Sequence, residues 1–197
     1  MYNIGGRGEP MQYYAHISED KTRKQTVKDH LTGTARRSEL FAEAFRCGAW
    51  GYGCGVLHDI GKIAIPDAIL KKTSRLTDEE YAIMKTHPVW GKKILAGLSF
   101  LPQADYGASY HHERYDGKGY PEGIRTDDLP YIVRIISAAD ALDAMNSNRC
   151  YRKQCSRNYI ISEFEKGSGT QFDPEVAETV IYLIEEGKIE IPEGENA

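Results

Sequence analysis

The chain has 197 residues, of which 41% are hydrophobic and 27% are charged. This length fits one domain with a sizeable core, and the composition is that of an ordinary globular protein. The net charge of −4 and the pI of about 5.9 argue against a broad basic face for duplex nucleic acid, although a local basic pocket for phosphate groups stays open.

Neither a membrane anchor nor a secretion signal is predicted. No apolar run approaches the roughly 18–20 residues that span a bilayer, and residues 1–7 lack the apolar core of a signal peptide. The cysteines at positions 47, 54, 150 and 155 have no C-x-x-C spacing, so we interpret them as reduced thiols. We therefore expect a cytoplasmic protein that does not bind a membrane.

The first half of the chain predicts helices after an extended lead-in over residues 1–19. Hydrophobic spacing predicts a helix over 22–45, and a glycine-containing helix follows over 50–61. The glycines suggest close packing against a neighbouring helix, because each costs about 1 kcal/mol in a helix relative to alanine. A short helix is expected over 66–70. Thr77 and Glu80 then form a capping box that opens a helix to about residue 87.

The second half continues the same pattern around one long loop, over residues 115–128. Ser156 and Asp173 are predicted helix caps, the latter followed by Pro174. The expected helices cover 88–98, the segment after Pro102 that carries His111 and His112, then 129–145, 156–166 and 173–186.

No segment predicts a strand, a repeat or an interdomain linker. The sequence thus predicts an all-α protein, with a single domain of about seven to nine helices over residues 20–187 and a loose acidic tail over 188–197.

Histidines and aspartates carry the chemistry. A lone histidine is usually a core or surface residue with a satisfied hydrogen bond, but this chain has two adjacent pairs in helix-forming segments, His58–Asp59 and His111–His112. Neighbours on a helix point about 100° apart, so two such pairs can flank two cations. Mixed imidazole and carboxylate ligands suit iron, manganese, nickel, cobalt or zinc better than calcium or magnesium.

A binuclear arrangement accounts for this set of residues. Asp59 would bridge the two ions, and a water held between them would lose a proton near neutral pH and act as the nucleophile. Lys62, four residues after His58, could stabilise the charged phosphoryl group. The remaining ligands would be His30, His58 and Asp140 for one ion and His87, His111 and His112 for the other.

Some of these assignments leave alternatives open. Asp140 lies in an apolar helix and needs a partner if it is buried, which could be a metal ion, a helix N-terminus or Arg134. Asp143 shares its face and could orient a ligand from behind. The basic run that holds Arg149 and Arg152 is either a solvated surface or a phosphate clamp.

Several motifs in order resemble the HD-GYP phosphodiesterase family over roughly residues 57–182. His58-Asp59-Ile60-Gly61-Lys62 with Ile65-Pro66 resembles the HD motif. The run from His111-His112-Glu113 to Gly119-Tyr120-Pro121 is similar to the second motif of that family, and further matches lie at 76–80, 84–88, 134–144 and 169–174.

The resemblance implies an all-α enzyme with two divalent transition-metal ions, iron and manganese foremost, that hydrolyses cyclic di-GMP to pGpG. Some members continue to GMP, and some prefer cyclic GMP-AMP. Trinuclear members carry a glutamate one turn before the first histidine, where this chain has Thr26. The implied metal ligands are His30, His58, Asp59, His87, His111, His112 and Asp140.

The resemblance also implies how substrate and partners are bound. Lys62, Arg149 and Arg152 align with substrate-phosphate contacts. Gly119, Tyr120 and Pro121 lie on a loop that the family links to specificity and to contacts with partners such as a diguanylate cyclase.

Two other functions remain. Residues 13–18, 29–31 and 33–35 resemble the start of the HD nuclease domain of CRISPR-associated helicase-nucleases, which supports a single-stranded nuclease or a nucleotide phosphohydrolase of the same superfamily. A degenerate domain would bind cyclic di-GMP or a diguanylate cyclase without turnover. The second motif and the intact set of ligands favour the cyclic dinucleotide phosphodiesterase.

Overall fold

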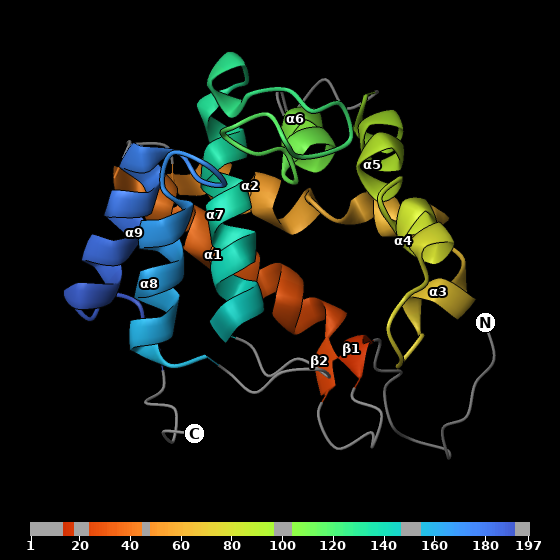
Figure 1. Ribbon diagram of the computed structural model, residues 1–197, viewed down its shortest axis with the longest axis horizontal. Helices are drawn as coiled ribbons and strands as arrows, with labels where there is room; N and C mark the ends of the chain where they lie inside the picture. Colours follow the sequence, from red (N-terminus) through yellow and green to blue (C-terminus); the bar gives the residue numbers. More distant parts are fainter. Residues whose placement is uncertain (1–13, 18–23, 45–47, 97–103, 147–154, 192–197) are drawn as a thin grey trace.

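A computed structural model describes residues 14–17, 24–44, 48–96, 104–146 and 155–191 of the chain. Helices dominate these residues, which confirms the all-α class (Figure 1). The α-helices are α1 (Val27–Ala44), α2 (Gly48–Leu57), α3 (Asp67–Leu70), α4 (Asp78–Met84), α5 (His87–Leu95), α6 (Ala104–Tyr110), α7 (Tyr131–Asn146), α8 (Arg157–Gly167) and α9 (Pro174–Glu185). Two 3₁₀ helices join them, η1 (Ile60–Ala64) and η2 (Thr126–Asp128).

The expectation that the chain has no strand was wrong. β1 (Tyr14–Ile17) and β2 (Lys24–Thr26) pair antiparallel ahead of α1. Strands of four and three residues are too short for an alternating hydrophobic pattern to reveal them. Their pairing gives backbone N–H and C=O groups partners before the first helix begins.

The core is built around α7, which packs against α1 and α2 on one side and against α8 and α9 on another (Figure 1). Ile135, Ile136 and Leu142 of α7 are completely buried, and they join Phe41 of α1 and Phe164 of α8 in one cluster. Each such side chain contributes about 1.5–3 kcal/mol by leaving water.

Glycine allows α1 and α2 to pack very closely, as the glycine content of the second helix predicted. A Cβ added at Gly55 would lie 2.8 Å from the Cα of Ala35 and 2.9 Å from Ser38 Oγ. These contacts leave no room for a larger side chain at position 55. The close approach brings the ends of both helices, and therefore His30 and His58, toward one place.

Three predicted helix caps are present. Thr77 accepts the N–H of Glu80, whose side chain in turn accepts the N–H of Thr77, so the capping box is complete. Ser156 accepts the N–H of Tyr159 at the start of α8. Asp173 accepts the N–H groups of Glu175 and Val176 at the start of α9.

The sequence placed both pairs, His58–Asp59 and His111–His112, inside helix-forming segments, but neither pair lies in a helix. α2 ends at Leu57 and α6 ends at Tyr110, so each pair lies in the turn directly after a helix. After the first pair the chain tightens into η1, where the N–H of Lys62 donates to the C=O of Asp59 at 2.9 Å. A turn lets adjacent side chains converge more closely than the 100° step of an α-helix allows.

The predicted domain starts at residue 20, and its residues 20–23 lie outside the described residues, whereas its predicted end at 187 lies within the described range 155–191. Within that range, Ile189 is buried in the core and its N–H donates to the C=O of Leu183. The packed part of the chain therefore continues beyond residue 187. No helix among the described residues has both the length and the apolar character needed to cross a bilayer.

Candidate metal centre

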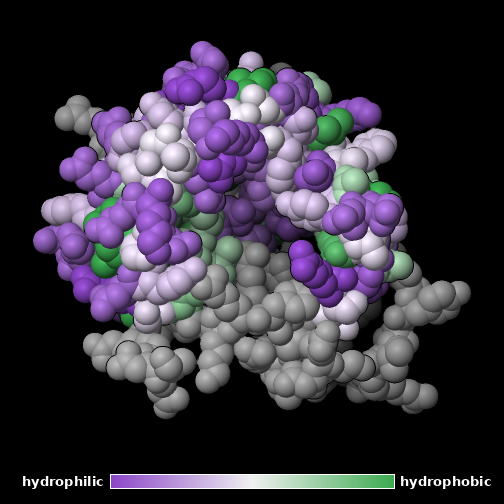
Figure 2. Space-filling model, in the orientation of Figure 1, coloured by the Kyte–Doolittle hydropathy of each residue, from purple (hydrophilic) through white to green (hydrophobic). Residues whose placement is uncertain are grey.

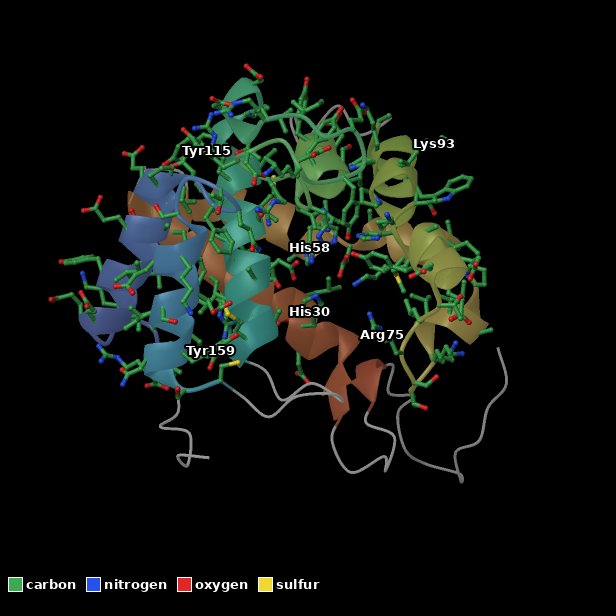
Figure 3. The ribbon with its side chains drawn as sticks, in the orientation of Figure 1. His30, His58, Arg75, Lys93, Tyr115 and Tyr159 are labelled. Atoms are coloured by element: carbon green, nitrogen blue, oxygen red, sulfur yellow. The ribbon has the colours of Figure 1, made fainter. Side chains whose placement is uncertain are left out.

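The structure brings together seven side chains that the sequence singled out as ligands. His30 projects from α1 and Asp140 from α7, and His87 is the first residue of α5. Figure 3 shows His30 and His58 directed into one space between α1, α2 and α7. The others come from the turns after α2 and α6, namely His58, Asp59, His111 and His112.

These side chains form three overlapping groups, and within each group the potential ligand atoms lie within 4.8 Å of one another. The first group consists of His30, His58 and Asp140, and the second of His87, His111 and His112. A third, made of His58, Asp59 and His111, lies across the other two. The sets match the two sites expected from the sequence, with Asp59 between them.

Asp59 presents one carboxylate oxygen to each set. Its Oδ2 lies 3.2 Å from His30 Nε2 and 3.3 Å from His58 Nε2. Its Oδ1 lies 3.4 Å from His87 Nε2 and 3.8 Å from His111 Nε2. A carboxylate in this position can bridge two cations.

Hydrogen bonds behind the rings turn the Nε2 atoms inward. The Nδ1 atoms of His58, His87 and His111 lie 2.7, 2.8 and 3.0 Å from the backbone carbonyls of residues 55, 84 and 107. The Nδ1 of His30 lies 2.8 Å from Asp143 Oδ2. A carbonyl can only accept, so each of the first three rings donates from Nδ1 and keeps a lone pair on Nε2.

The residues fit divalent cations. His87 Nε2 and His111 Nε2 face each other at 3.3 Å although both carry lone pairs, and the buried Nε2 of His58 has no hydrogen-bond partner among the described residues. Orphaned buried acceptors of this kind are costly unless a cation or a proton lies between them. Imidazole nitrogens with carboxylate oxygens suit a transition metal.

Charge within the site favours the ligating form of its groups. Burial alone would raise the pKa of Asp59, but Lys62, His58 and His30 hold it well below its usual range. Burial likewise opposes ionisation of Asp140, while His58, His30 and His112 lower its pKa.

The imidazoles respond differently to the same surroundings. Burial, reinforced by neighbouring rings, lowers the pKa of His111 well below its usual value, and burial brings that of His112 to about 4. His30 is the exception. Burial lowers its pKa, but its hydrogen bonds to Asp143 and Asp59 outweigh this and raise it to about 9.

Lys62 lies beside the centre. Its Nζ is 2.6 Å from Asp59 Oδ2, and a third of its side chain is exposed. Lys62 therefore contacts the buried Asp59 and is also accessible to solvent. Figure 2 shows the surface hollowed near the middle of this view, with hydrophilic residues around the hollow.

The sequence is compatible with three partners for Asp140, namely a metal ion, a helix N-terminus or Arg134, and the structure excludes the last two. Arg134 does not contact Asp140, since its Nη1 lies 2.8 Å from Asp173 Oδ2. Asp140 Oδ1 instead lies 3.8 Å from both His30 Nε2 and His58 Nε2. It is also in the interior of α7 and not at a helix N-terminus.

The Gly119-Tyr120-Pro121 segment lies directly against the centre. The Tyr120 ring stacks on His112 with centroids 4.6 Å apart and planes 25° apart. Burial raises the pKa of Tyr120, and the negative charges of Asp140 and Asp59 raise it further. The loop expected to govern specificity thus forms part of the wall.

Two predicted residues cannot be placed, and one residue was missed. Arg149 and Arg152 lie outside the described residues. Figure 3 shows Arg75, between α3 and α4, with its side chain directed toward the space that His30 and His58 face. Arg75 lies two residues before the N-cap residue Thr77, and no motif in its local sequence marks it.

The family follows from comparison with known proteins. A family model described as "HD domain" matches residues 49–176. The chain belongs to the HD domain family. This match includes His58, Asp59, His87, His111, His112 and Asp140, and it confirms the family predicted from the motifs.

Relatives of this HD domain include named phosphodiesterases. A cyclic di-GMP phosphodiesterase of Vibrio cholerae serotype O1 is 35% identical over 178 residues, which cover 87% of this chain and 36% of the relative. One of Thermotoga maritima is 44% identical over 133 residues, covering 66% of this chain and 36% of the relative. A 3′3′-cGAMP-specific phosphodiesterase of V. cholerae serotype O1 is 38% identical over 127 residues, covering 64% and 24%. The chain spans about a third of the length of the first two.

Solved structures support the same fold. An HDG"Y"P protein from Bdellovibrio bacteriovorus matches with a TM-score of 0.64 at 17% identity, covering 86% of this chain and 55% of that one. The HD domain of the L. monocytogenes phosphodiesterase PgpH, solved with cyclic di-AMP, matches with a TM-score of 0.54 at 19% identity, covering 83% and 92%. At these identities the likeness concerns the fold alone.

Proposed function

We propose that this HD domain is a metal-dependent phosphodiesterase that hydrolyses cyclic di-GMP to pGpG at the centre around Asp59. The position of Asp59 carries the proposal, because its two oxygens face two separate sets of ligands. The relatives named as cyclic di-GMP phosphodiesterases support the choice of substrate.

Seven side chains of this HD domain would hold two divalent ions, iron or manganese foremost. His30, His58 and Asp140 would hold one, and His87, His111 and His112 the other, with Asp59 between them. When bound, such ions neutralise phosphate charge and lower the pKa of water to about neutrality.

The remaining residues would act on the substrate. Lys62 Nζ, beside Asp59 and partly exposed, would donate to the phosphoryl oxygens as negative charge develops on them. Arg75 is directed toward the same space and would neutralise a second phosphate (Figure 3). Tyr120 would exclude water from one side, since its ring covers His112.

A turnover assay with matched variants tests the proposal. Purified protein loaded with Fe(II) or Mn(II) should convert cyclic di-GMP to pGpG, and Asp59→Ala should abolish this. Asp127→Ala is the control, because that exposed carboxylate pairs with Arg125 at the surface and with no other described residue. Retention of activity by Asp59→Ala would refute the mechanism.

The same assay separates the competing functions. Cyclic di-GMP, cyclic GMP-AMP and single-stranded DNA are compared side by side, with metal analysis of the protein as isolated. Faster turnover of cyclic GMP-AMP would assign that dinucleotide as the substrate, and faster cleavage of DNA would favour a nuclease. Binding of cyclic di-GMP without turnover in any metal would favour a degenerate domain.

A further inference from the structure

Glu113 is a buried carboxylate that none of the proposed catalytic steps uses. It follows His112 directly and is only 1% exposed. No lysine, arginine or histidine forms a salt bridge with it among the described residues. Burial of an unpaired carboxylate is costly, so a structural reason for its position is required.

Backbone amides of the next loop take the place of a cation. The Oε1 of Glu113 accepts the N–H of Glu122 at 2.7 Å and the N–H of Gly123 at 3.0 Å. Hydrogen bonds from backbone N–H groups to an ionised carboxylate are among the stronger ones. Gly123 has a φ of +69°, a conformation that side chains rarely adopt. Glu113 therefore anchors the far end of the 119–123 loop.

The first residues of the loop, Gly119 and Tyr120, contact residues 112–114. The N–H of Tyr120 donates to the C=O of His112 at 3.2 Å. A Cβ added at Gly119 would lie 2.5 Å from the Cα of Glu113 and 2.6 Å from the N of Arg114. Only glycine permits this approach, so both ends of the loop contact His112 and Glu113.

His112 differs from the other four imidazoles of the centre. Each of the others has an Nδ1 hydrogen bond to an oxygen that fixes the angle of its ring. Within the described part of the chain, no such bond holds His112, and its ring is stacked on Tyr120 instead. Partners behind a ligand normally orient it for the metal, and here the aromatic ring of the loop takes that place.

We propose that Glu113 is a positioning residue which, through the 119–123 loop, holds Tyr120 against His112 and so orients this imidazole for its cation. The inference rests on the proposed metal centre. It assigns the loop a role in metal binding that is separate from substrate specificity.

Metal binding without substrate tests the inference. Mn(II) affinity and stoichiometry are measured by titration calorimetry and metal analysis on the full chain. Glu113→Ala and Tyr120→Ala should each lower the affinity for one of the two Mn(II) ions by about 10–100-fold and leave the affinity for the other unchanged. Tyr120→Phe keeps the stacking ring and should bind like the unchanged protein. Glu113→Gln keeps an acceptor oxygen and should lose less than Glu113→Ala.

A double variant tests whether the two residues act through one path. Glu113→Ala combined with Tyr120→Ala should be no worse than the poorer single variant, whereas independent contributions would add. Lys118→Ala is the matched control, since this exposed residue directly precedes the 119–123 loop and its loss should leave the binding of both ions unchanged.

The positioning role of Glu113 and the proposed metal centre are refuted by different results. If the unchanged protein binds two ions and both alanine variants do so with unchanged affinity, Glu113 and Tyr120 do not position a ligand, and the centre itself stands. Additive losses, or a Tyr120→Phe loss as large as that of Tyr120→Ala, also overturn the inference. If the unchanged protein binds no ion, both fail. If Glu113→Ala does not fold, Glu113→Gln and the Tyr120 pair decide.

Discussion

Asp143 and His30 are joined by a 2.8 Å contact between Oδ2 and Nδ1 that links α7 to α1 across 113 positions of the chain. The other oxygen of Asp143 lies 2.6 Å from Arg37 Nη1, and the carboxylate is buried. A carboxylate that accepts the Nδ1–H of a histidine leaves its Nε2 free for a metal ion and makes it more basic. The packing of α1 against α7 is thus coupled directly to the metal centre.

Asp143→Asn should therefore weaken binding of the ion held by His30. The amide can still accept one hydrogen bond, but it loses the charge that supports both His30 and Arg37. We expect a loss of about 10–100-fold in Mn(II) affinity for one ion, measured by calorimetry. Asp127→Asn provides the control, because within the described part of the chain its carboxylate pairs with Arg125 alone, at the surface. Equal affinities in the two variants would show that Asp143 has no influence on the centre.

Lys62→Ala should separate catalysis from metal binding. Removal of one donor to a developing charge typically lowers kcat by about 10²–10³-fold. Because Lys62 contacts Asp59 from the solvent side and offers no ligand atom while charged, metal content should stay at the level of the unchanged protein. Steady-state kinetics and metal analysis on the same sample check this. Loss of bound metal together with activity would assign Lys62 to the integrity of the centre instead.

The metal-free protein should be most stable near pH 6.5. The pKa of His30 is about 9 in the folded state against an ordinary 6.5, so its contribution is complete below about 6.5 and is lost as pH rises through 9. Burial holds the pKa of His112 at about 4, so the unfolded state alone takes up that proton, and stability falls as pH drops from about 6.5 to 4.

Urea unfolding of chelator-treated protein between pH 4 and 9 measures this profile. His30→Gln should remove the decline above pH 6.5 and leave the acid side in place. Stability that rises steadily from pH 6 to 9 in the unchanged protein would contradict the assigned proton on His30.

Features that depend on neighbouring residues could be predicted from the sequence. Thr77 with Glu80, Ser156 and Asp173 were predicted as caps and do cap their helices, because a cap requires only the first turn of its own helix. The histidines were grouped from residue type and adjacent pairing. Their division into two sets was also predicted, and the fold brings the members of each set together from elements far apart in the chain.

Features that depend on tertiary contact could not be predicted. The sequence could not exclude Arg134 as the partner of Asp140, because the ion pair of Arg134 with Asp173 joins residues 39 positions apart in the chain. The end of α2 was placed four residues too late, since the tightening into η1 becomes evident only where Gly61 packs against α5. Nothing in the local sequence distinguishes His112, whose ring is held by a residue of the following loop.

Two glycines should respond to alanine in opposite directions. A Cβ at Gly61 would collide with the backbone carbonyl of His87 and lie 2.5 Å from the N of Gly91, so η1 and α5 would have to move apart. Gly53, inside α2, has no described atom within 4 Å of such a Cβ. Alanine should stabilise that helix by about 1 kcal/mol, while Gly61→Ala should destabilise the protein by about 1–3 kcal/mol, as overpacking does.

Urea unfolding measures both variants, and metal analysis adds a second readout. Because η1 follows Asp59 directly and α5 begins with His87, separation of the two elements in Gly61→Ala should also lower metal affinity. Gly53→Ala should bind metal like the unchanged protein. Gly61→Ala with unchanged stability and unchanged affinity would mean that the contact between η1 and α5 does not hold the two sets of ligands together.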